Sequence, residues 1–154
     1  MAIPLPGLKR ILVSIDYSST GDRALAWAVL HARTFAAELI VLHVIERGVH
    51  FGTFGYSETP GTPELSGDHA RLEAHLREKL ADSGLVVRAL VEVGDSAFKI
   101  REVAKRDSVD LIVIGTHGKS GIGDLLFSSV EEKIIHHTGC PVLTVPPTSE
   151  EEEG

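Results

Sequence analysis

The chain has 154 residues, of which 43% are hydrophobic and 24% charged, as in one ordinary globular domain. Its net charge of −7 argues against a general nucleic-acid-binding role, because such proteins carry a basic face. The single cysteine excludes an intrachain disulfide, and no run reaches the ~18 apolar residues of a membrane span. We therefore expect a cytoplasmic protein with no nucleic-acid or membrane partner.

The predicted elements alternate strictly between strands and helices. In chain order they are strand 10–15, a helix from Ser18 or Ser19 to Phe35, strand 38–44, a helix from Pro63 or Glu64 to a stop at Gly84, strand 86–93, a helix from Asp95 or Ser96, strand 110–114, a helix from Ser128 or Ser129 to Gly139, and strand 141–145. This order predicts an α/β fold with a parallel sheet and helices on both faces.

Hydrophobic patterns indicate which strands lie inside the sheet and which face of each helix is buried. Four strands are nearly continuous apolar runs, typical of strands covered on both faces, whereas 86–93 alternates and is expected at an edge. The helices should turn apolar stripes inward, and these are Ala24, Leu25, Ala28, Ala32 and Phe35 in the first, Leu65, Leu72, Leu76 and Leu80 in the second, and Ile100, Val103 and Ala104 in the third.

Two segments fall outside this pattern. Residues 46–67 form one long irregular stretch that is rich in glycine and contains two prolines, and it is either a lid, a partner-binding loop or an insertion without a role. The tail 148–154 ends in glutamates and is expected to be disordered, which leaves one domain over residues 1–147.

The fourth strand runs into a glycine-rich loop, 115–123, with four glycines in nine residues. Such a loop lets the backbone approach a ligand closely, and the helix beginning near Ser128 and Ser129 offers free N–H groups to an anion. Because open α/β sheets bind ligands beyond the carboxyl ends of their strands, Asp16 at the end of the first strand should face the same place. The sequence thus predicts a phosphate site.

Two common phosphate motifs are ruled out here. Gly118-Lys119-Ser120 resembles the end of a Walker A loop, but Val113 stands where that motif needs its first glycine. The order Gly118, Gly121, Gly123 reverses the spacing of a dinucleotide GxGxxG.

What remains is Gly-x-x-Gly, nine residues, and Ser128-Ser129, and with it the stretch 115–145 resembles the universal stress proteins. The opening strand with Asp16 and Ser18, the fourth strand 110–115 and the closing segment 139–145 are similar to that family as well. The resemblance implies a Rossmann-like fold of the adenine nucleotide alpha hydrolase type with strand order 3-2-1-4-5.

The resemblance also implies ligands and partners. It implies ATP or a related adenine nucleotide, with Mg²⁺ as a further expected component, and a homodimer through the last strand at Pro141, Val142, Leu143 and Val145. The nucleotide-binding residues it implies are Ile15, Asp16, Val44, Gly115, Thr116, His117, Gly118, Ser128, Ser129 and Val130. A lysine at Val142 or Val145 is expected to give monomers or aggregates.

One departure keeps three functions open. The family motif has glycine where this chain has Ser128, whose side chain would narrow the phosphate pocket and could favour AMP or ADP over ATP. The functions are a nucleotide-binding stress regulator, a slow ATPase or nucleotidyl transferase, and a dimeric interaction module without nucleotide. No acid–base or nucleophile–base pair accompanies Asp16, which disfavours the enzyme.

The remaining chemically notable residues have plain interpretations. His43 is expected to be a hydrogen-bonded core residue, Trp27 to pack, and Cys140 to be an inert thiol. His136 and His137 end a helix and point apart, so no metal site is predicted there.

Overall fold

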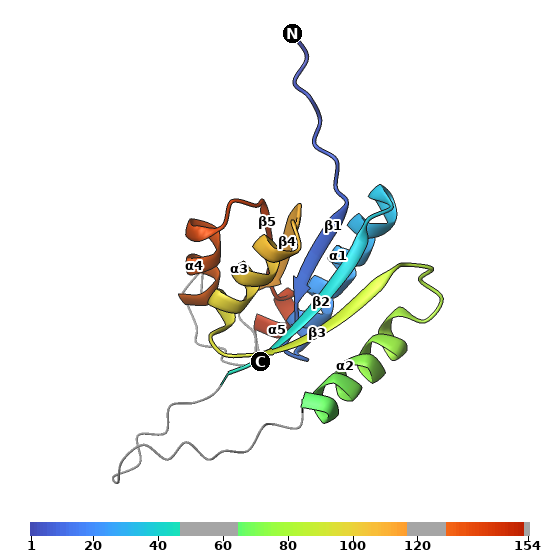
Figure 1. Ribbon diagram of the computed structural model, residues 1–154. Coiled ribbons are helices and arrows are strands. Elements are labelled where there is room, and N and C mark those ends of the chain that lie inside the picture. Colours follow the sequence, from blue (N-terminus) through green and yellow to red (C-terminus); the bar gives the residue numbers. More distant parts are fainter. Residues whose placement is uncertain (47–64, 117–128, 153–154) are drawn as a thin grey trace, which may run out of the picture.

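The computed structural model describes residues 1–46, 65–116 and 129–152 (Figure 1). The elements alternate as the sequence predicts, with one short helix added at the end of the chain. They are β1 (Arg10–Ser14), α1 (Ser19–Phe35), β2 (Glu38–Ile45), α2 (Leu65–Leu80), β3 (Val87–Val93), α3 (Ser96–Arg106), β4 (Leu111–Gly115), α4 (Ser129–His137), β5 (Val142–Val145) and α5 (Ser149–Glu152).

The five strands form one parallel sheet in the order β3-β2-β1-β4-β5, which confirms the predicted order. β3, which alternates in sequence, lies at one edge as expected, and β5 lies at the other. In register, Val13 of β1 is flanked by Val41 of β2 and Val113 of β4. β2 and β3 lie on one side of β1, and β4 and β5 lie on the other. The strand order therefore reverses between β1 and β4, and their carboxyl ends form the switch point of the sheet.

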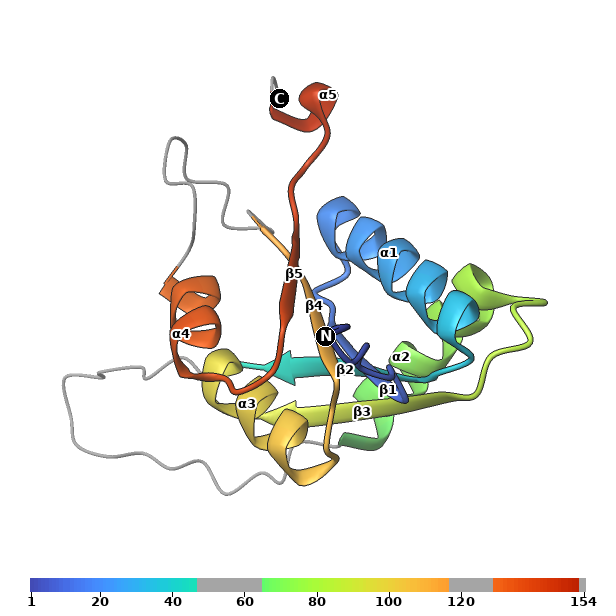
Figure 2. The same ribbon diagram turned by 90° about the horizontal axis from the view of Figure 1, so that it is seen from above.

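Two hydrophobic cores lie on opposite faces of the sheet. On one face, α1 and α2 bury Leu25 and Leu72 against β1 and β2. On the other, α3 and α4 bury Ile100 and Ile134. Figure 2 shows this division, with α1 and α2 on one side of the strands and α3 and α4 on the other. The sheet is thus covered on both faces, which explains the continuous apolar runs of its inner strands.

Local capping explains where the helices begin and end. The Ser18 side chain accepts a hydrogen bond from the Gly21 N–H at the start of α1, and Asp95 accepts one from the Phe98 N–H at the start of α3. α1 ends at Ala36, whose backbone is left-handed with φ 53°.

Three residues that we expected to pack against the rest of the protein are instead exposed. Phe35, the last residue of α1, is about half exposed, and Leu65, the first residue of α2, is 40% exposed. Both residues have the correct helical angle but lie at a helix end, where little of the protein packs against them. Trp27 is not a packing residue either, since it is 42% exposed.

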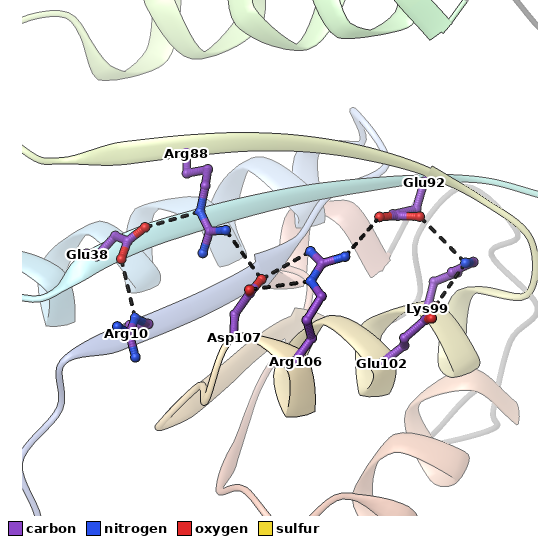
Figure 3. A network of polar contacts seen from close by, with 8 residues as sticks. All are labelled: Arg10, Glu38, Arg88, Glu92, Lys99, Glu102, Arg106 and Asp107. Carbon is purple, nitrogen blue, oxygen red and sulfur yellow. Dashed lines mark hydrogen bonds and ion pairs between the residues drawn. The ribbon is translucent and has the colours of Figure 1, made fainter.

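A chain of ion pairs ties the end of α3 to the strands of one sheet edge (Figure 3). Arg88 on β3 contacts Glu38 at 3.2 Å and Asp107 at 3.5 Å. The Asp107 pKa is lowered, chiefly by its hydrogen bond from Arg106; burial opposes this shift, and the charge of Arg88 adds a smaller lowering effect. The complete network is Arg10, Glu38, Arg88, Glu92, Lys99, Glu102, Arg106 and Asp107.

The two ends of the chain differ from the compact body. The first seven residues extend away from the sheet, and Ile3 and Leu5 are exposed (Figure 1). In the tail, which we expected to be disordered, the structure forms α5 over Ser149–Glu152. None of the described helices is long and apolar enough to cross a membrane.

Candidate functional site

A cavity of about 450 Å³ opens beyond the carboxyl ends of β1 and β4, at the switch point of the sheet. This volume falls within the range of small-molecule sites, and the position is where open α/β sheets bind ligands. The described residues that line it come from the ends of β1, β2 and β4, from the start of α1 and from the first two turns of α3 and α4.

The structure brings five of the predicted residues together in this cavity. Its lining includes Ile15, Asp16, Val44, Gly115 and Val130. Residues from three strand ends and one helix start therefore meet in one cavity.

The other predicted site residues do not line the cavity or lie outside the residues that the structure describes. Thr116 is buried, its N–H donates to the Val145 carbonyl at 2.9 Å, and it is not among the lining residues. His117, Gly118 and Ser128 lie outside the described residues. Ser129 is the first residue of α4, which places its backbone at the helix start.

The bend between β1 and α1 fixes the Asp16 carboxylate. The Ser18 N–H donates to Asp16 Oδ1 at 3.0 Å, and the Ser18 hydroxyl also donates to this oxygen. Gly21 faces the same carboxylate, since a Cβ atom there would lie 2.8 Å from Asp16 Oδ1. Only glycine leaves room for this arrangement, so the sequence of the bend holds one carboxylate orientation at the cavity.

Gly115 allows close packing of β4 against α1. A Cβ atom at Gly115 would lie 2.9 Å from Thr20 Cγ2 and 3.0 Å from the Thr20 carbonyl oxygen. We expected this glycine to let a ligand approach the backbone, and the structure shows that it first lets the start of α1 approach. Gly115 and Thr20 both line the cavity, so this contact joins two parts of its wall.

Sequence reasoning missed two acids of the cavity. Glu46 and Glu131 line it together with Asp16, so Asp16 is not the only acid at this place. Glu46 follows β2 and accepts a hydrogen bond from the Ser96 hydroxyl at 2.6 Å, while Glu131 is 5% exposed in the first turn of α4. Glu46 could have been found by its place at a strand end, whereas Glu131 had the spacing of a helix cap and nothing in the sequence marked it as buried.

His43 also lines the cavity, which the prediction of a core residue did not include. Its Nδ1 lies 3.0 Å from the Ile15 carbonyl oxygen, so the ring is hydrogen-bonded as expected. Because a carbonyl only accepts, Nδ1 carries the proton in this contact.

Tyr17 stands between Asp16 and Ser18 with an unusual backbone. Its φ is 62°, in the left-handed region that residues with side chains rarely adopt. The ring centroid lies 4.7 Å from the His43 ring and 5.2 Å from the His75 ring of α2, and the Arg71 guanidinium carbon lies 4.2 Å from it. Burial raises the Tyr17 pKa and the charge of Asp68 adds to this, whereas the Arg71 charge opposes it.

The charge of the cavity limits what it can hold. Three carboxylates line it, and its described lining contains no Lys or Arg. An anionic ligand would need backbone N–H groups, the positive end of α4 or a bound cation to offset these carboxylates. In the described parts of the chain, no group of three His, Cys, Asp or Glu side chains could hold a metal ion by itself.

The fold and the cavity define an open, doubly wound α/β domain with a ligand-sized site at its switch point. The sequence matches the universal stress protein family over residues 7–146. The chain therefore belongs to this family.

Individual relatives agree over nearly the whole chain. Universal stress protein YxiE of Bacillus subtilis is 33% identical over 145 residues, covering 88% of this chain and 97% of the relative. The solved structure of MJ0577, a universal stress protein of Methanocaldococcus jannaschii, is 30% identical, with a TM-score of 0.74 over 94% of this chain and 99% of that one.

Two more distant solved structures share the fold and contain nucleotides. One is a universal stress protein in complex with cAMP, with a TM-score of 0.68 and 23% identity over 91% of this chain and 98% of that one. The other, from Archaeoglobus fulgidus, is in complex with dAMP, with a TM-score of 0.65 and 19% identity over 91% and 99% of the two chains.

Proposed function

We propose that this chain is a stress-response regulator that binds an adenine nucleotide in the cavity at the ends of β1 and β4 and works as a homodimer. The main observation in support is that Asp16, Val44, Gly115 and Val130 line one cavity of about 450 Å³. The cAMP and dAMP complexes of two family members support an adenine nucleotide as the ligand.

The described residues fit a nucleotide in the following way. Asp16 would accept hydrogen bonds from the ribose hydroxyls, and the backbone near Val44 would meet the base. The start of α4, at Ser129 and Val130, would turn its free N–H groups toward a phosphate. His117, Gly118 and Ser128 complete the proposed phosphate site, and Ser128 in place of the family glycine could favour AMP or ADP over ATP.

The acids of the cavity make Mg²⁺ part of the proposal. Phosphates beside Glu131 and Asp16 would be repelled unless a cation lies between the two charges. Since the described residues offer no metal site of their own, Mg²⁺ would enter on the nucleotide. We expect the affinity for ATP to fall when Mg²⁺ is removed, and the affinity for AMP to change less.

Binding of ATP, ADP, AMP and GTP, each with and without Mg²⁺, tests the proposal by calorimetry. Asp16→Asn keeps the shape of the bend and removes the charge, so it should weaken adenine nucleotide binding about tenfold, the effect of losing one hydrogen bond to a charged group. Asp82→Asn, which makes the same change at an exposed position between α2 and β3, is the control. A wild-type chain that binds none of the four nucleotides would leave only the interaction-module function.

A weak ATPase is the second candidate, because Glu46 and Glu131 add acids to the cavity. The same preparations, incubated with ATP and Mg²⁺, measure it by phosphate release. The regulatory function predicts nucleotide binding with little or no turnover.

The proposed dimer uses the free edge of β5. Val142, Leu143 and Thr144 are half-buried in the single chain, and β5 has a neighbour on one side only. An unpaired apolar edge favours pairing with another strand. Val145 is only 2% exposed within the chain, so a lysine there would damage the fold itself and would not report on the dimer.

A further inference from the structure

The Tyr17 ring connects the cavity with helix α2. On the cavity side it packs against His43, which lines the cavity and is hydrogen-bonded to the Ile15 carbonyl. On the other side it meets the edge-on ring of His75 and the guanidinium of Arg71, one helical turn apart on α2. One side chain thus bridges the end of β2 and the face of α2.

The ring, and not the hydroxyl, makes these contacts. The Tyr17 hydroxyl is buried and has no hydrogen-bond partner among the described residues. The backbone of Tyr17 is left-handed, a conformation that persists only where the surroundings impose it. Two sets of contacts surround this bend, which are the hydrogen bonds from Ser18 to Asp16 and the aromatic contacts of the Tyr17 ring with β2 and α2.

The same helix is fastened to the start of α1. His75 Nε2 lies 2.7 Å from Asp22 Oδ1, and Lys79 Nζ lies 3.1 Å from Asp22 Oδ2. Leu72 and Leu76 are the only buried residues of α2, so a few contacts decide how this helix packs on the sheet. Several of those contacts are made to the segment 16–22, whose Asp16, Ser18, Thr20 and Gly21 line the cavity.

We propose that Tyr17 is a positioning residue that couples the docking of α2 to the orientation of Asp16, so that nucleotide binding and α2 docking strengthen each other. This inference rests on the nucleotide function proposed above. Coupling is reciprocal, so a ligand that fixes the bend stabilises α2 by the same factor by which a docked α2 improves the affinity.

The test compares Tyr17→Leu, which removes the ring, with Tyr17→Phe, which keeps it. Without nucleotide, amide hydrogen exchange of residues 65–80 should be about tenfold faster in Tyr17→Leu than in Tyr17→Phe, within the usual range of coupling. Exchange in α3, on the opposite face of the sheet, should not change. Equal exchange of α2 in the two variants would overturn the proposal.

The second measurement follows amide exchange of α2 in the presence of nucleotide. ATP with Mg²⁺ should slow exchange of α2 in the wild type, and Tyr17→Leu should abolish this effect and weaken ATP binding about tenfold, whereas Tyr17→Phe restores both. Val103→Ala, a buried position of α3 that does not line the cavity, controls for a general loss of stability. It should leave the effect of ATP on α2 intact.

The outcomes separate this inference from the function on which it rests. A wild type that binds ATP while exchange in α2 stays the same overturns the coupling and leaves the function standing. A wild type that binds no nucleotide overturns both. Tyr17→Leu that binds ATP as tightly as Tyr17→Phe also overturns the coupling.

Discussion

Gly115→Ala tests whether the close approach of α1 and β4 builds the cavity. The added Cβ atom would lie 2.9 Å from Thr20 Cγ2, 3.0 Å from the Thr20 carbonyl oxygen and 3.2 Å from the carbonyl carbon. Two of these atoms belong to the backbone of the first turn of α1, and Thr20 is 3% exposed, so relief requires the helix to move. Overpacking of this kind costs about 1–3 kcal/mol.

For a domain of this size the cost corresponds to a fall in Tm of about 2–12 °C. Urea unfolding followed by circular dichroism measures it as a shift of the midpoint. Gly67→Ala is the matched control, because a Cβ atom there meets nothing within 4 Å and the position is helical. The control should gain about 0.5–1 kcal/mol, the opposite sign.

A second change identifies the clash. Thr20→Ser removes Cγ2 but leaves the carbonyl oxygen 3.0 Å from the new Cβ atom, so it should rescue Gly115→Ala only in part. An unchanged unfolding midpoint in Gly115→Ala would refute the packing argument. If the variant were as stable as the wild type but lost nucleotide, the glycine would serve the ligand and not the helix.

Three further predictions follow from other described contacts. Tyr17→Phe removes a buried hydroxyl that has no partner in the described structure, so calorimetry should find its stability unchanged or up to about 1 kcal/mol higher, and a clear loss would mean that the hydroxyl is bound. Because the Asp107 pKa is lowered on folding, its contribution to stability is present above the ordinary aspartate pKa of about 3.9 and is lost as the pH falls through the folded value. Asp107→Asn should therefore flatten the acid side of the stability–pH curve, and equal slopes would contradict this. Thr144→Pro removes an N–H from the free edge of β5, since the carbonyls of Pro141 and Val145 face β4 and parallel strands alternate. It should yield a folded monomer by light scattering, and an unchanged dimer would place the interface elsewhere.

Much of the fold could be predicted because the strands are buried on both faces. Val13, Val41 and Val113 lie side by side in the middle of the sheet, and each comes from a segment that is apolar throughout. Alternation of strands and helices then leaves a parallel sheet as the simple solution. The strand order itself came from the family resemblance, since periodicity does not say which strands are neighbours.

The predictions that failed are those that depend on where an element ends. Phe35 has the helical angle of Ala24 and Ala28, but the chain turns away at Ala36 directly after it. Periodicity gives the direction of a side chain and not the presence of a partner beneath it. The same limit applies to Trp27, which we expected to pack and which is 42% exposed on α1.

Only part of the site could be predicted, because some of its residues reach the cavity through the packing of whole elements. Asp16 and the loop at Gly115 follow from the rule that ligands bind beyond strand ends, whereas Val44 came from the family resemblance, and all three line the cavity. His43 and Glu131 belong to the same cavity but have ordinary sequence contexts, a strand and a helix cap. Their place depends on how β2 and α4 pack against the sheet, and that is a property of the folded chain.

The bend 16–21 departs from the backbone preferences of its residues, and it lies at the edge of the cavity. Tyr17 has a left-handed backbone, which costs a residue with a side chain about 1–2 kcal/mol, and Gly21 gives up helix propensity to make room for Asp16. Both choices oppose a stable turn taken by itself, and both orient one carboxylate at the cavity. Strained backbone tends to cluster at functional sites, but it also occurs at turns, and here Ala36, Asp82 and Ser108 are left-handed just after helices end. Tyr17 differs from these three because it stands between Asp16 and Ser18, which both line the cavity, and this position connects its strained backbone with the site.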